Sequence, residues 1–351
     1  MNHVKFADLQ TNLVTIAVGG LGAGLGYLTS LPLYALIGPA ILVSLLNMAG
    51  GHFRISPFVR NTAFLFLGIS IGSGLDVNSL DALLEWPIAF LALSIMLVIS
   101  IFSGRVILTR GFAFDRREAV LATSPGHLSF VVSLGIEIQD DAARILVIQS
   151  IRLLALTLCV PFIAILFGVE VGNSLLPPGE AIAIWNAVSL VFLSIVAGYL
   201  FEQIRVPAAY LMSGMIVSSI GHVTELTPGI LPESVILPGF VILGCLIGSR
   251  FSGISFQQLK ATIFAGLTVT ALTGFLAVAF AIPVAFLLSM PVAHVILAFA
   301  PGGLETMIIM GSVLGANPGF LAACHVARLF ILSFLVPVML GRNFHRTNKI
   351  P

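Results

Sequence analysis

Charged residues are scarce in this 351-residue chain. They make up 9% of it, against about 25% in soluble globular proteins. The formal net charge is +1, and no cluster of Lys and Arg offers a surface for nucleic acid. Hydrophobic residues make up 58%, and apolar runs of about 17–25 residues, long enough to span a bilayer, recur from Thr15 to Leu340. We therefore predict an all-α polytopic membrane protein that contacts the lipid bilayer, has essentially no soluble domain and binds no nucleic acid.

Clustered metal ligands are also lacking. The three cysteines, Cys159, Cys245 and Cys324, lie in apolar segments at unrelated spacings, which is typical of packing residues. The seven histidines are scattered, and no two share a predicted helix at ligand spacing. This argues against an enzyme such as a copper monooxygenase. We expect no catalytic residue, no metal and no cofactor, apart from H⁺ or Na⁺ as a coupling ion.

The chain contains an internal duplication with a spacing of 176 residues. Arg152 and Arg328 are separated by this distance (328 − 152 = 176), and so are the motifs at 67–73 and 243–249. No gap is needed from residue pair 22/198 to pair 161/337. A repeat of this kind decides the whole fold. We predict a first membrane repeat at 1–167, a linker at 168–184 and a second membrane repeat at 185–351.

Five apolar spans are predicted in each repeat. They cover 13–29, 32–50, 58–75, 86–108 and 144–167 in the first, and 186–201, 207–223, 236–250, 262–288 and 320–340 in the second. A sixth apolar segment in each repeat, 117–137 and 293–313, is interrupted by Pro-Gly. Proline lacks an N–H and glycine weakens a helix interior, so two half-helices are expected in each.

The positions of the cations decide whether these broken segments cross the membrane or return. If both return, all fourteen loop Lys and Arg residues (16 − 2 = 14) lie on the cytoplasmic side. If both cross, four of them move outside. We therefore predict re-entrant hairpins, ten spanning helices, both termini in the cytoplasm and no signal peptide, in a bacterial inner membrane. Five spans per repeat is an odd number, so the two repeats are inverted, as in many secondary transporters.

The broken segments carry a recognisable pair of motifs. Ser-Pro-Gly-His-Leu-Ser at 124–129 and Ala-Pro-Gly-Gly-Leu-Glu at 300–305 resemble the paired motifs of the membrane AbrB duplication family. The helices that follow, with Gln149-x-x-Arg152-Leu and His325-x-x-Arg328-Leu, resemble that family too, and the likeness covers nearly the whole chain. Members have been described as regulators or ammonia monooxygenases and are also grouped with secondary transporters. The first motif departs from the pattern, with His127 in place of a glycine.

Arg152 and Arg328 are predicted at the depth of the hairpin tips. Nine residues of helix from Arg116 to Pro125 span about 14 Å, close to half of a hydrocarbon core of about 30 Å. A charge there costs at least about 2.5–3.5 kcal/mol, so a substrate or coupling role is favoured. A guanidinium fork matches a carboxylate or phosphate. The alternative is structural: each arginine satisfies the carbonyls of its own broken hairpin, or pairs with Glu305.

The hairpin tips are the other half of the predicted site. Broken helices expose backbone N–H and C=O groups, and a half-helix N-terminus favours an anion; the alternative is a tight turn that needs Pro and Gly for shape alone. The predicted substrate-binding residues are Ser124, Pro125, Gly126, His127, Ser129, Arg152, Pro301, Gly302, Gly303, Glu305 and Arg328. The candidate groups for proton or ion coupling are Glu305, His127, His325 and Gln149, although each histidine can also be a hydrogen-bonded core residue.

Two functions remain after these exclusions. The first is a secondary-active transporter, an exporter or symporter, of a small anionic solute bound at the midplane between the hairpins. The second is a membrane-embedded regulator of gene expression, acting directly or through metabolite transport. The glycine-rich segment 19–26 indicates close helix packing, with a homodimer interface as one reading.

Overall fold

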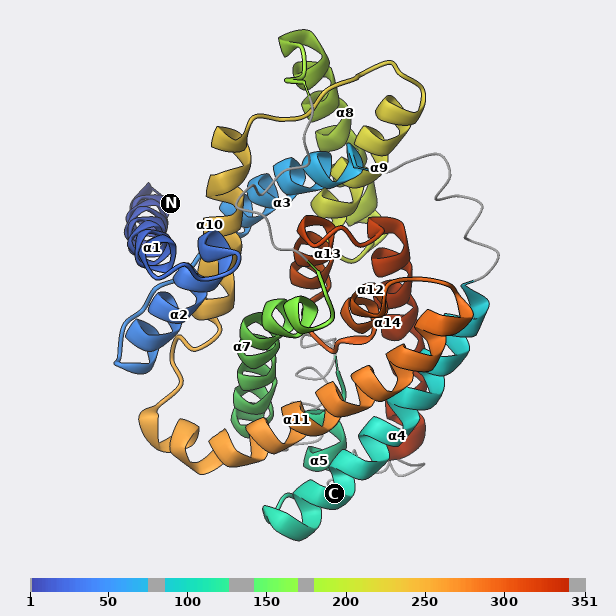
Figure 1. Ribbon diagram of the computed structural model, residues 1–351. Coiled ribbons are helices and arrows are strands. Elements are labelled where there is room, and N and C mark those ends of the chain that lie inside the picture. Colours follow the sequence, from blue (N-terminus) through green and yellow to red (C-terminus); the bar gives the residue numbers. More distant parts are fainter. Residues whose placement is uncertain (1, 75–85, 126–141, 170–179, 341–351) are drawn as a thin grey trace, which may run out of the picture. The chain divides into compact units, whose positions relative to one another are not determined.

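The computed structural model describes residues 2–74, 86–125, 142–169 and 180–340, and this part of the chain is helical (Figure 1). It contains 13 helices and no strand, which confirms the all-α prediction. The helices are α1 (Asn2–Leu28), α2 (Tyr34–Met48), α3 (Pro57–Gly72), α4 (Pro87–Gly111), α5 (Arg116–Thr123), α7 (Ala142–Leu166), α8 (Ile184–Gln203), α9 (Ala209–Val223), α10 (Glu233–Ser249), α11 (Phe256–Leu287), α12 (Val292–Phe299), α13 (Leu304–Val313) and α14 (Pro318–Leu340).

Each of the ten predicted spans corresponds to one helix. Six helices are long and apolar enough to cross a membrane, and several expose apolar side chains along their length. They are α1 from Leu9, α4, α7, α8, α11 and α14. This agrees with a multi-pass membrane protein. The largest differences from the predicted ends are at the starts of α1 and α11, which begin earlier because polar residues there continue the helix.

The other four predicted spans form shorter helices. α2 and α9 have 15 residues each, α3 has 16 and α10 has 17. At about 1.5 Å per residue they reach about 22–26 Å, less than a hydrocarbon core of about 30 Å. Local backbone chemistry sets their starts. Leu33 (φ 49°) and Ala208 (φ 50°) are left-handed and precede α2 and α9, while α3 begins at Pro57 after its Ser56 cap.

The helix boundaries repeat at the spacing found in the sequence. α5 and α12 are offset by 176 at both ends (292 − 116 and 299 − 123), and left-handed Ala113 and Ser289 precede them at the same spacing. The predicted break in the second hairpin is confirmed, because α12 ends at Phe299 and α13 begins at Leu304. In the first hairpin α5 ends at Thr123, before Ser124-Pro125. The residues after Pro125, up to 141, lie outside the described part of the chain.

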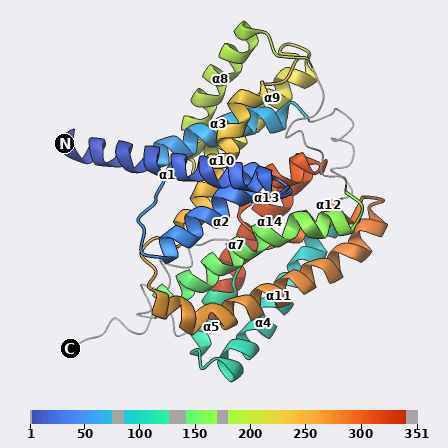
Figure 2. The same cartoon turned by 60° about the vertical axis from the view of Figure 1, so that its left-hand side comes forward.

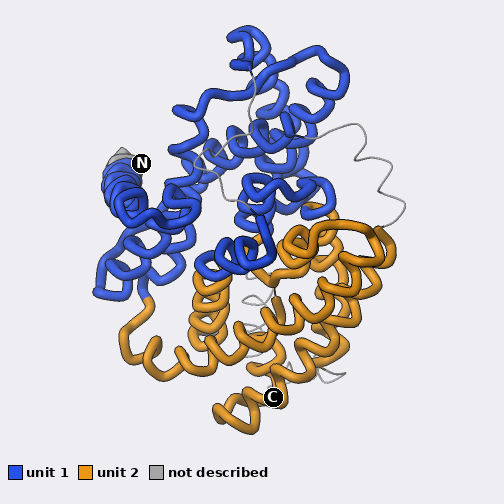
Figure 3. Tube along the Cα trace, viewed as in Figure 1, with its two compact units in different colours: residues 1–83, 157–253, 304–321 blue, residues 84–156, 254–303, 322–351 orange. Residues whose placement is uncertain are grey.

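The chain divides into two compact units (Figure 3). Unit 1 comprises Met1–Leu83, Thr157–Gly253 and Leu304–Leu321. Unit 2 comprises Leu84–Leu156, Ile254–Gly303 and Ala322–Pro351. Each unit draws equivalent helices from both predicted repeats: α1 to α3 and α8 to α10 in unit 1, and α4, α5, α11 and α12 in unit 2.

Unit 1 contains two related groups of three helices. In one, α1, α2 and α10 pack together; in the other, α8, α9 and α3 pack together (Figures 1 and 2). Each group combines the first two helices of one repeat with the third helix of the other. Glycines make the closest crossings. Gly68 of α3 lies against the backbone of Leu211 in α9, and Gly244 of α10 lies against the backbone of Leu36 in α2.

In unit 2, the first half-helix of each broken segment packs beside a long helix. α5 packs on α4, α12 packs on α11, and α4 also packs on α11. Gly104 of α4 lies against the Thr123 side chain at the end of α5, and Gly266 of α11 lies against Ile151 of α7. The first of these approaches places the end of α5 against α4, and the second places α7, which carries Arg152, against α11.

Candidate functional site

Arg152 lies on α7 in unit 2 and is buried, with 3% of its surface exposed. Its Nη2 donates to the carbonyl oxygen of Ser124 at 3.5 Å and to Gln149 Oε1 at 3.2 Å. Its Nε and Nη1 have no hydrogen-bond partner within the described residues. The guanidinium therefore contacts the end of α5 with one nitrogen and keeps two nitrogens without a protein acceptor.

Gln149 completes the end of α5. The carbonyl of Leu121 would accept a helical hydrogen bond from residue 125, but Pro125 has no N–H. Gln149 Nε2 donates instead to the Leu121 carbonyl at 3.1 Å and to the Ser124 carbonyl at 3.4 Å. The Ser124 hydroxyl donates back to the carbonyl of Val120 at 2.7 Å. Gln149 thus supplies the donor that the proline removes.

Arg328 lies on α14 in unit 2 and is 1% exposed. Its Nη1 donates to the carbonyl of Ala300 at 2.7 Å and its Nη2 to the carbonyl of Gly302 at 3.1 Å. Ala300 is the equivalent of Ser124 (300 − 124 = 176), so both arginines bind the carbonyl of the residue that precedes the hairpin proline. These contacts agree with the alternative prediction that each arginine satisfies the carbonyls of its own broken hairpin. The nitrogens without a described partner remain available to bind a ligand.

His325 lies one turn before Arg328 on α14 and is fully buried, at 0% exposure. Neither ring nitrogen has a hydrogen-bond partner in the part of the chain that the structure describes. The same is true of Arg328 Nε. Buried polar groups in native proteins are almost always hydrogen-bonded, and those that are not call for an explanation.

The charge of this region is not balanced by described carboxylates. Neither Arg152 nor Arg328 forms a salt bridge with an Asp or Glu of the described residues; the ion pair in unit 2 joins Arg144 to Glu118 at 3.4 Å. Two buried cations with N–H groups in excess form an arrangement that can bind an anion.

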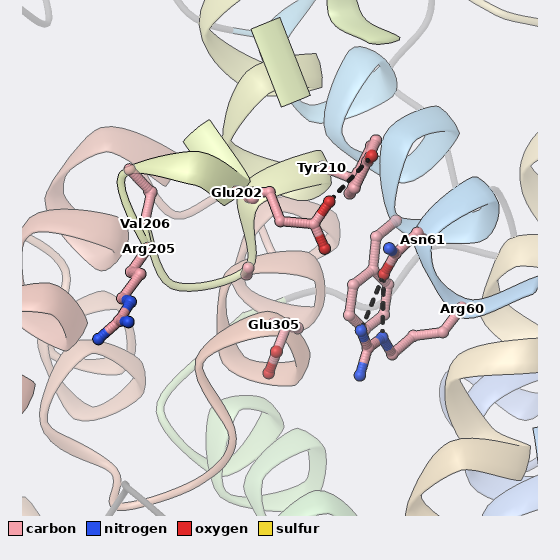
Figure 4. Close-up of a pocket in the computed structure, with 10 residues that line it drawn as sticks. Arg60, Asn61, Glu202, Arg205, Val206, Tyr210 and Glu305 are labelled. Carbon is pink, nitrogen blue, oxygen red and sulfur yellow. Dashed lines mark hydrogen bonds between the residues drawn. The ribbon is translucent and has the colours of Figure 1, made fainter. Parts of the chain in front are cut away.

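Glu305 lies in unit 1, on the first turn of α13, and is half-buried. It lines a cavity of about 260 Å³ whose charged and polar lining also includes Arg60, Asn61, Glu202, Arg205 and Tyr210 (Figure 4). Tyr210 donates to Glu202 Oε2 at 3.3 Å, and Arg60 donates to Asn61 Oδ1 at 3.1 Å through Nε and 3.0 Å through Nη2. The charged lining of this cavity therefore consists of two basic side chains, Arg60 and Arg205, and two acidic ones, Glu202 and Glu305.

The remaining predicted residues divide into two sets. Ser124, Pro125, Pro301 and Gly302 are buried, and Gly303 is half-buried, at the two helix breaks. Gly126, His127 and Ser129 lie outside the described residues. Within the described part, no group of three or more His, Cys, Asp or Glu residues could hold a metal ion.

The comparisons with known proteins agree with the paired motifs. A family model named AbrB, described as "Transition state regulatory protein AbrB", matches residues 9–342. The chain belongs to the AbrB family. One relative, "Uncharacterized protein YhjN" of Bacillus subtilis (strain 168), is 25% identical over 368 residues, covering 95% of this chain and 93% of the relative. Another, "Putative regulator AbrB" of Escherichia coli (strain K12), is 23% identical over 343 residues, covering 92% and 94%.

Sequence reasoning missed the polar lining of the unit 1 cavity. Arg60 and Arg205 were counted only as loop cations, although each lies at an end of an apolar helix. Glu202 and Tyr210 carried a usable signal, because acidic residues number only 15 with aspartate included and tyrosines only 4. The sequence also suggested ion coupling for Gln149, whereas the structure places its amide on the backbone of α5.

Proposed function

We propose that this AbrB-family chain is a secondary-active transporter, an exporter or symporter, of a small anionic solute. The observation that carries the proposal is the pair of buried guanidinium groups, Arg152 and Arg328. Each has at least one nitrogen without a partner among the described residues, and neither forms a salt bridge with a described carboxylate. An uncompensated buried charge is strongly unfavourable, so a protein that retains two of them is expected to gain something from an anion.

The proposed architecture supports this reading. We propose two inverted repeats of five spanning helices, each with one re-entrant hairpin, in a bacterial inner membrane. The helix breaks at 124–125 and 300–303 provide backbone groups beside the arginines, and discontinuous helices near the midplane are a common feature of secondary-transporter binding sites. The short α2, α3, α9 and α10 are counted among the ten spans. The solute site is proposed at the two hairpin tips and the two arginines.

A ligand screen on purified protein tests the function. Small carboxylates, sulfate, phosphate and sulfonates are compared by thermal shift, and the anions that raise the melting temperature are then supplied to proteoliposomes. We expect at least one anion to stabilise the wild type, to be taken up, and to lose both effects in Arg152→Ala. Failure of every anion to stabilise the protein or enter the vesicles would remove the proposal.

Regulation is the alternative function, suggested by the description of the AbrB family and by the name of the Escherichia coli relative. Movement of a metabolite can alter gene expression indirectly, so a transport defect and a regulatory phenotype are compatible. A direct regulator would change expression of its targets even when anion binding is abolished, so a transcript comparison of wild type and Arg152→Ala separates the two.

The orientation of the chain gives a further prediction. In a cysteine-free background, Arg110→Cys and Arg205→Cys are expected to react with a membrane-impermeant maleimide only from the cytoplasmic side. Leu175→Cys is expected to react only from the periplasmic side. The reason is the cytoplasmic placement of all fourteen loop cations (16 − 2 = 14). Labelling of position 205 from outside would mean that the first hairpin crosses the membrane and that the repeats are not inverted.

Glu305 is the group that we propose for proton coupling. Its cavity contains other charged groups, Arg60, Glu202 and Arg205, and protonation of Glu305 removes one negative charge. Coupling between two ligands is reciprocal, so a proton carried by Glu305 is expected to make anion affinity differ between low and neutral pH, with the higher affinity at low pH. Glu305→Gln should keep anion binding and lose this difference, whereas Glu202→Gln, in the same cavity, should retain it. An unchanged pH response in Glu305→Gln would transfer the role to His127, His325 or a sodium site.

A further inference from the structure

The duplicated helices α7 and α14 carry two equivalent pairs of polar residues. Gln149 corresponds to His325 (325 − 149 = 176) and Arg152 corresponds to Arg328 (328 − 152 = 176). All four side chains are buried within unit 2, between 0% and 5% exposed. Equivalent positions in a duplicated chain are expected to make equivalent contacts. A difference between their contacts in the structure therefore indicates a difference in role.

In the first repeat the glutamine holds the hairpin. Gln149 donates to the carbonyls of Leu121 and Ser124 at 3.1 and 3.4 Å. Arg152 makes only a long contact of 3.5 Å to the Ser124 carbonyl and a bond of 3.2 Å to Gln149. Its Nε and Nη1 have no partner in the described residues. The Arg152 guanidinium thus makes weaker contacts with the hairpin backbone than the Gln149 amide does.

In the second repeat it is the arginine that contacts the hairpin backbone. Arg328 donates to the carbonyls of Ala300 and Gly302 at 2.7 and 3.1 Å, which commits both terminal nitrogens to the helix break. His325 makes no hydrogen bond with either ring nitrogen to any described residue, although it is fully buried. Among the described residues, His325 therefore has no partner for either ring nitrogen, whereas Arg328 lacks a partner for one nitrogen of its guanidinium, Nε.

We infer that the four residues divide two tasks between them: Arg152 and His325 bind a small oxoanion, while Gln149 and Arg328 are positioning residues that hold the two broken helices. The inference rests on the proposed function and specifies which residues carry it. A guanidinium supplies charged donors to the oxoanion, and an imidazole N–H supplies one further donor. The buried nitrogens without partners are then satisfied by the ligand, as buried polar groups generally are.

The test compares conservative substitutions at equivalent positions, using sulfate and acetate as probes. For each purified full-length variant, the melting temperature without anion and the dissociation constant from calorimetry are measured separately. Arg152→Lys and His325→Gln are expected to keep the melting temperature within a few degrees and to weaken binding at least about tenfold. Glutamine is the residue at the equivalent position 149 of the first repeat. We therefore expect His325→Gln to fold, so that weaker binding in this variant reports the loss of the imidazole.

The positioning residues should show the opposite pattern. Arg328→Gln and Gln149→Leu are expected to lower the melting temperature by more than about 5 °C. Arg328→Lys, which retains a donor for the carbonyls, should recover most of this loss and weaken binding of the probe less than Arg152→Lys does. Equal weakening of binding by Arg152→Lys and Arg328→Lys, or wild-type affinity in His325→Gln, would overturn the division of tasks while leaving the proposed function intact. Absence of binding of both probes to the wild type would remove the inference, whereas the proposed function is tested separately by the wider ligand screen.

Discussion

Gly68→Leu and Gly244→Leu are each expected to prevent the chain from accumulating as a folded protein. A Cβ atom at Gly68 would collide with the carbonyl oxygen of Leu211, and one at Gly244 with the carbonyl oxygen of Leu36. Overpacking a core usually costs about 1–3 kcal/mol. Here the added side chain meets a helix backbone, which cannot move aside as a side chain can by changing its rotamer. Since domains are stable by only about 5–15 kcal/mol, separating α3 from α9 or α10 from α2 removes a large share of the total.

The measurement is the yield of monodisperse protein in size-exclusion chromatography, followed by the melting temperature. Gly20→Leu is the matched control, because Gly20 lies in the interior of α1 and a Cβ there meets nothing within 4 Å. Ala substitutions at Gly68 and Gly244 should fall between wild type and Leu. A wild-type melting temperature for Gly68→Leu would show that α3 and α9 do not cross at this glycine.

Gly302→Leu is expected to abolish transport while leaving expression largely intact. Gly302 is buried at the break between α12 and α13, and its carbonyl accepts from Arg328 Nη2 at 3.1 Å. A leucine side chain at this buried position would displace the break and this hydrogen bond. Hydrogen bonds to charged groups contribute about 1.5–3 kcal/mol, which corresponds to roughly ten- to hundredfold in an equilibrium constant.

Uptake of the anion identified by the ligand screen, normalised to the amount of folded protein, measures this effect. Gly24→Leu supplies the control for an added leucine, because a Cβ at Gly24 also meets nothing within 4 Å. If Gly302→Leu transports at the wild-type rate, the break tolerates a side chain at this position and Gly302 takes no part in binding.

Much of the fold could be predicted along the chain, because the governing interactions are local. Apolar runs indicated each long helix, since a backbone in lipid must satisfy its own hydrogen bonds. Pro301 and the glycines after it indicated the gap between Phe299 and Leu304, because proline removes a donor and glycine weakens a helix. The short helices were less predictable, since α2 and α9 start after left-handed Leu33 and Ala208, residue types that rarely adopt that conformation.

The candidate site was predictable in its membership and not in its contacts. Arg152 and Arg328 stood out because charge is rare in apolar helices, and Gln149 and His325 because they precede the arginines by one turn. Which of these side chains meets a backbone carbonyl depends on how α7 lies against α5 and α14 against the 300–303 break. The proton-coupling candidate Glu305 was visible as a lone carboxylate, but Arg60, Glu202 and Arg205 gather around it only when α3, α8 and α13 are folded together.

The sequence by itself determined that this protein is helical, embedded in a membrane and duplicated at a spacing of 176 residues (328 − 152), because hydrophobic length, proline position and internal repetition are properties of the chain. Only the tertiary structure decided that α3 crosses α9 and α2 crosses α10, and that Gln149 and Arg328 donate to the backbone at the helix breaks. It also showed that two nitrogens of Arg152 and both ring nitrogens of His325 have no partner among the described residues. The physical reason is that a hydrogen bond across 26 to 28 residues of sequence, such as those from Arg328 to Gly302 and Ala300, depends on distances that only packing sets.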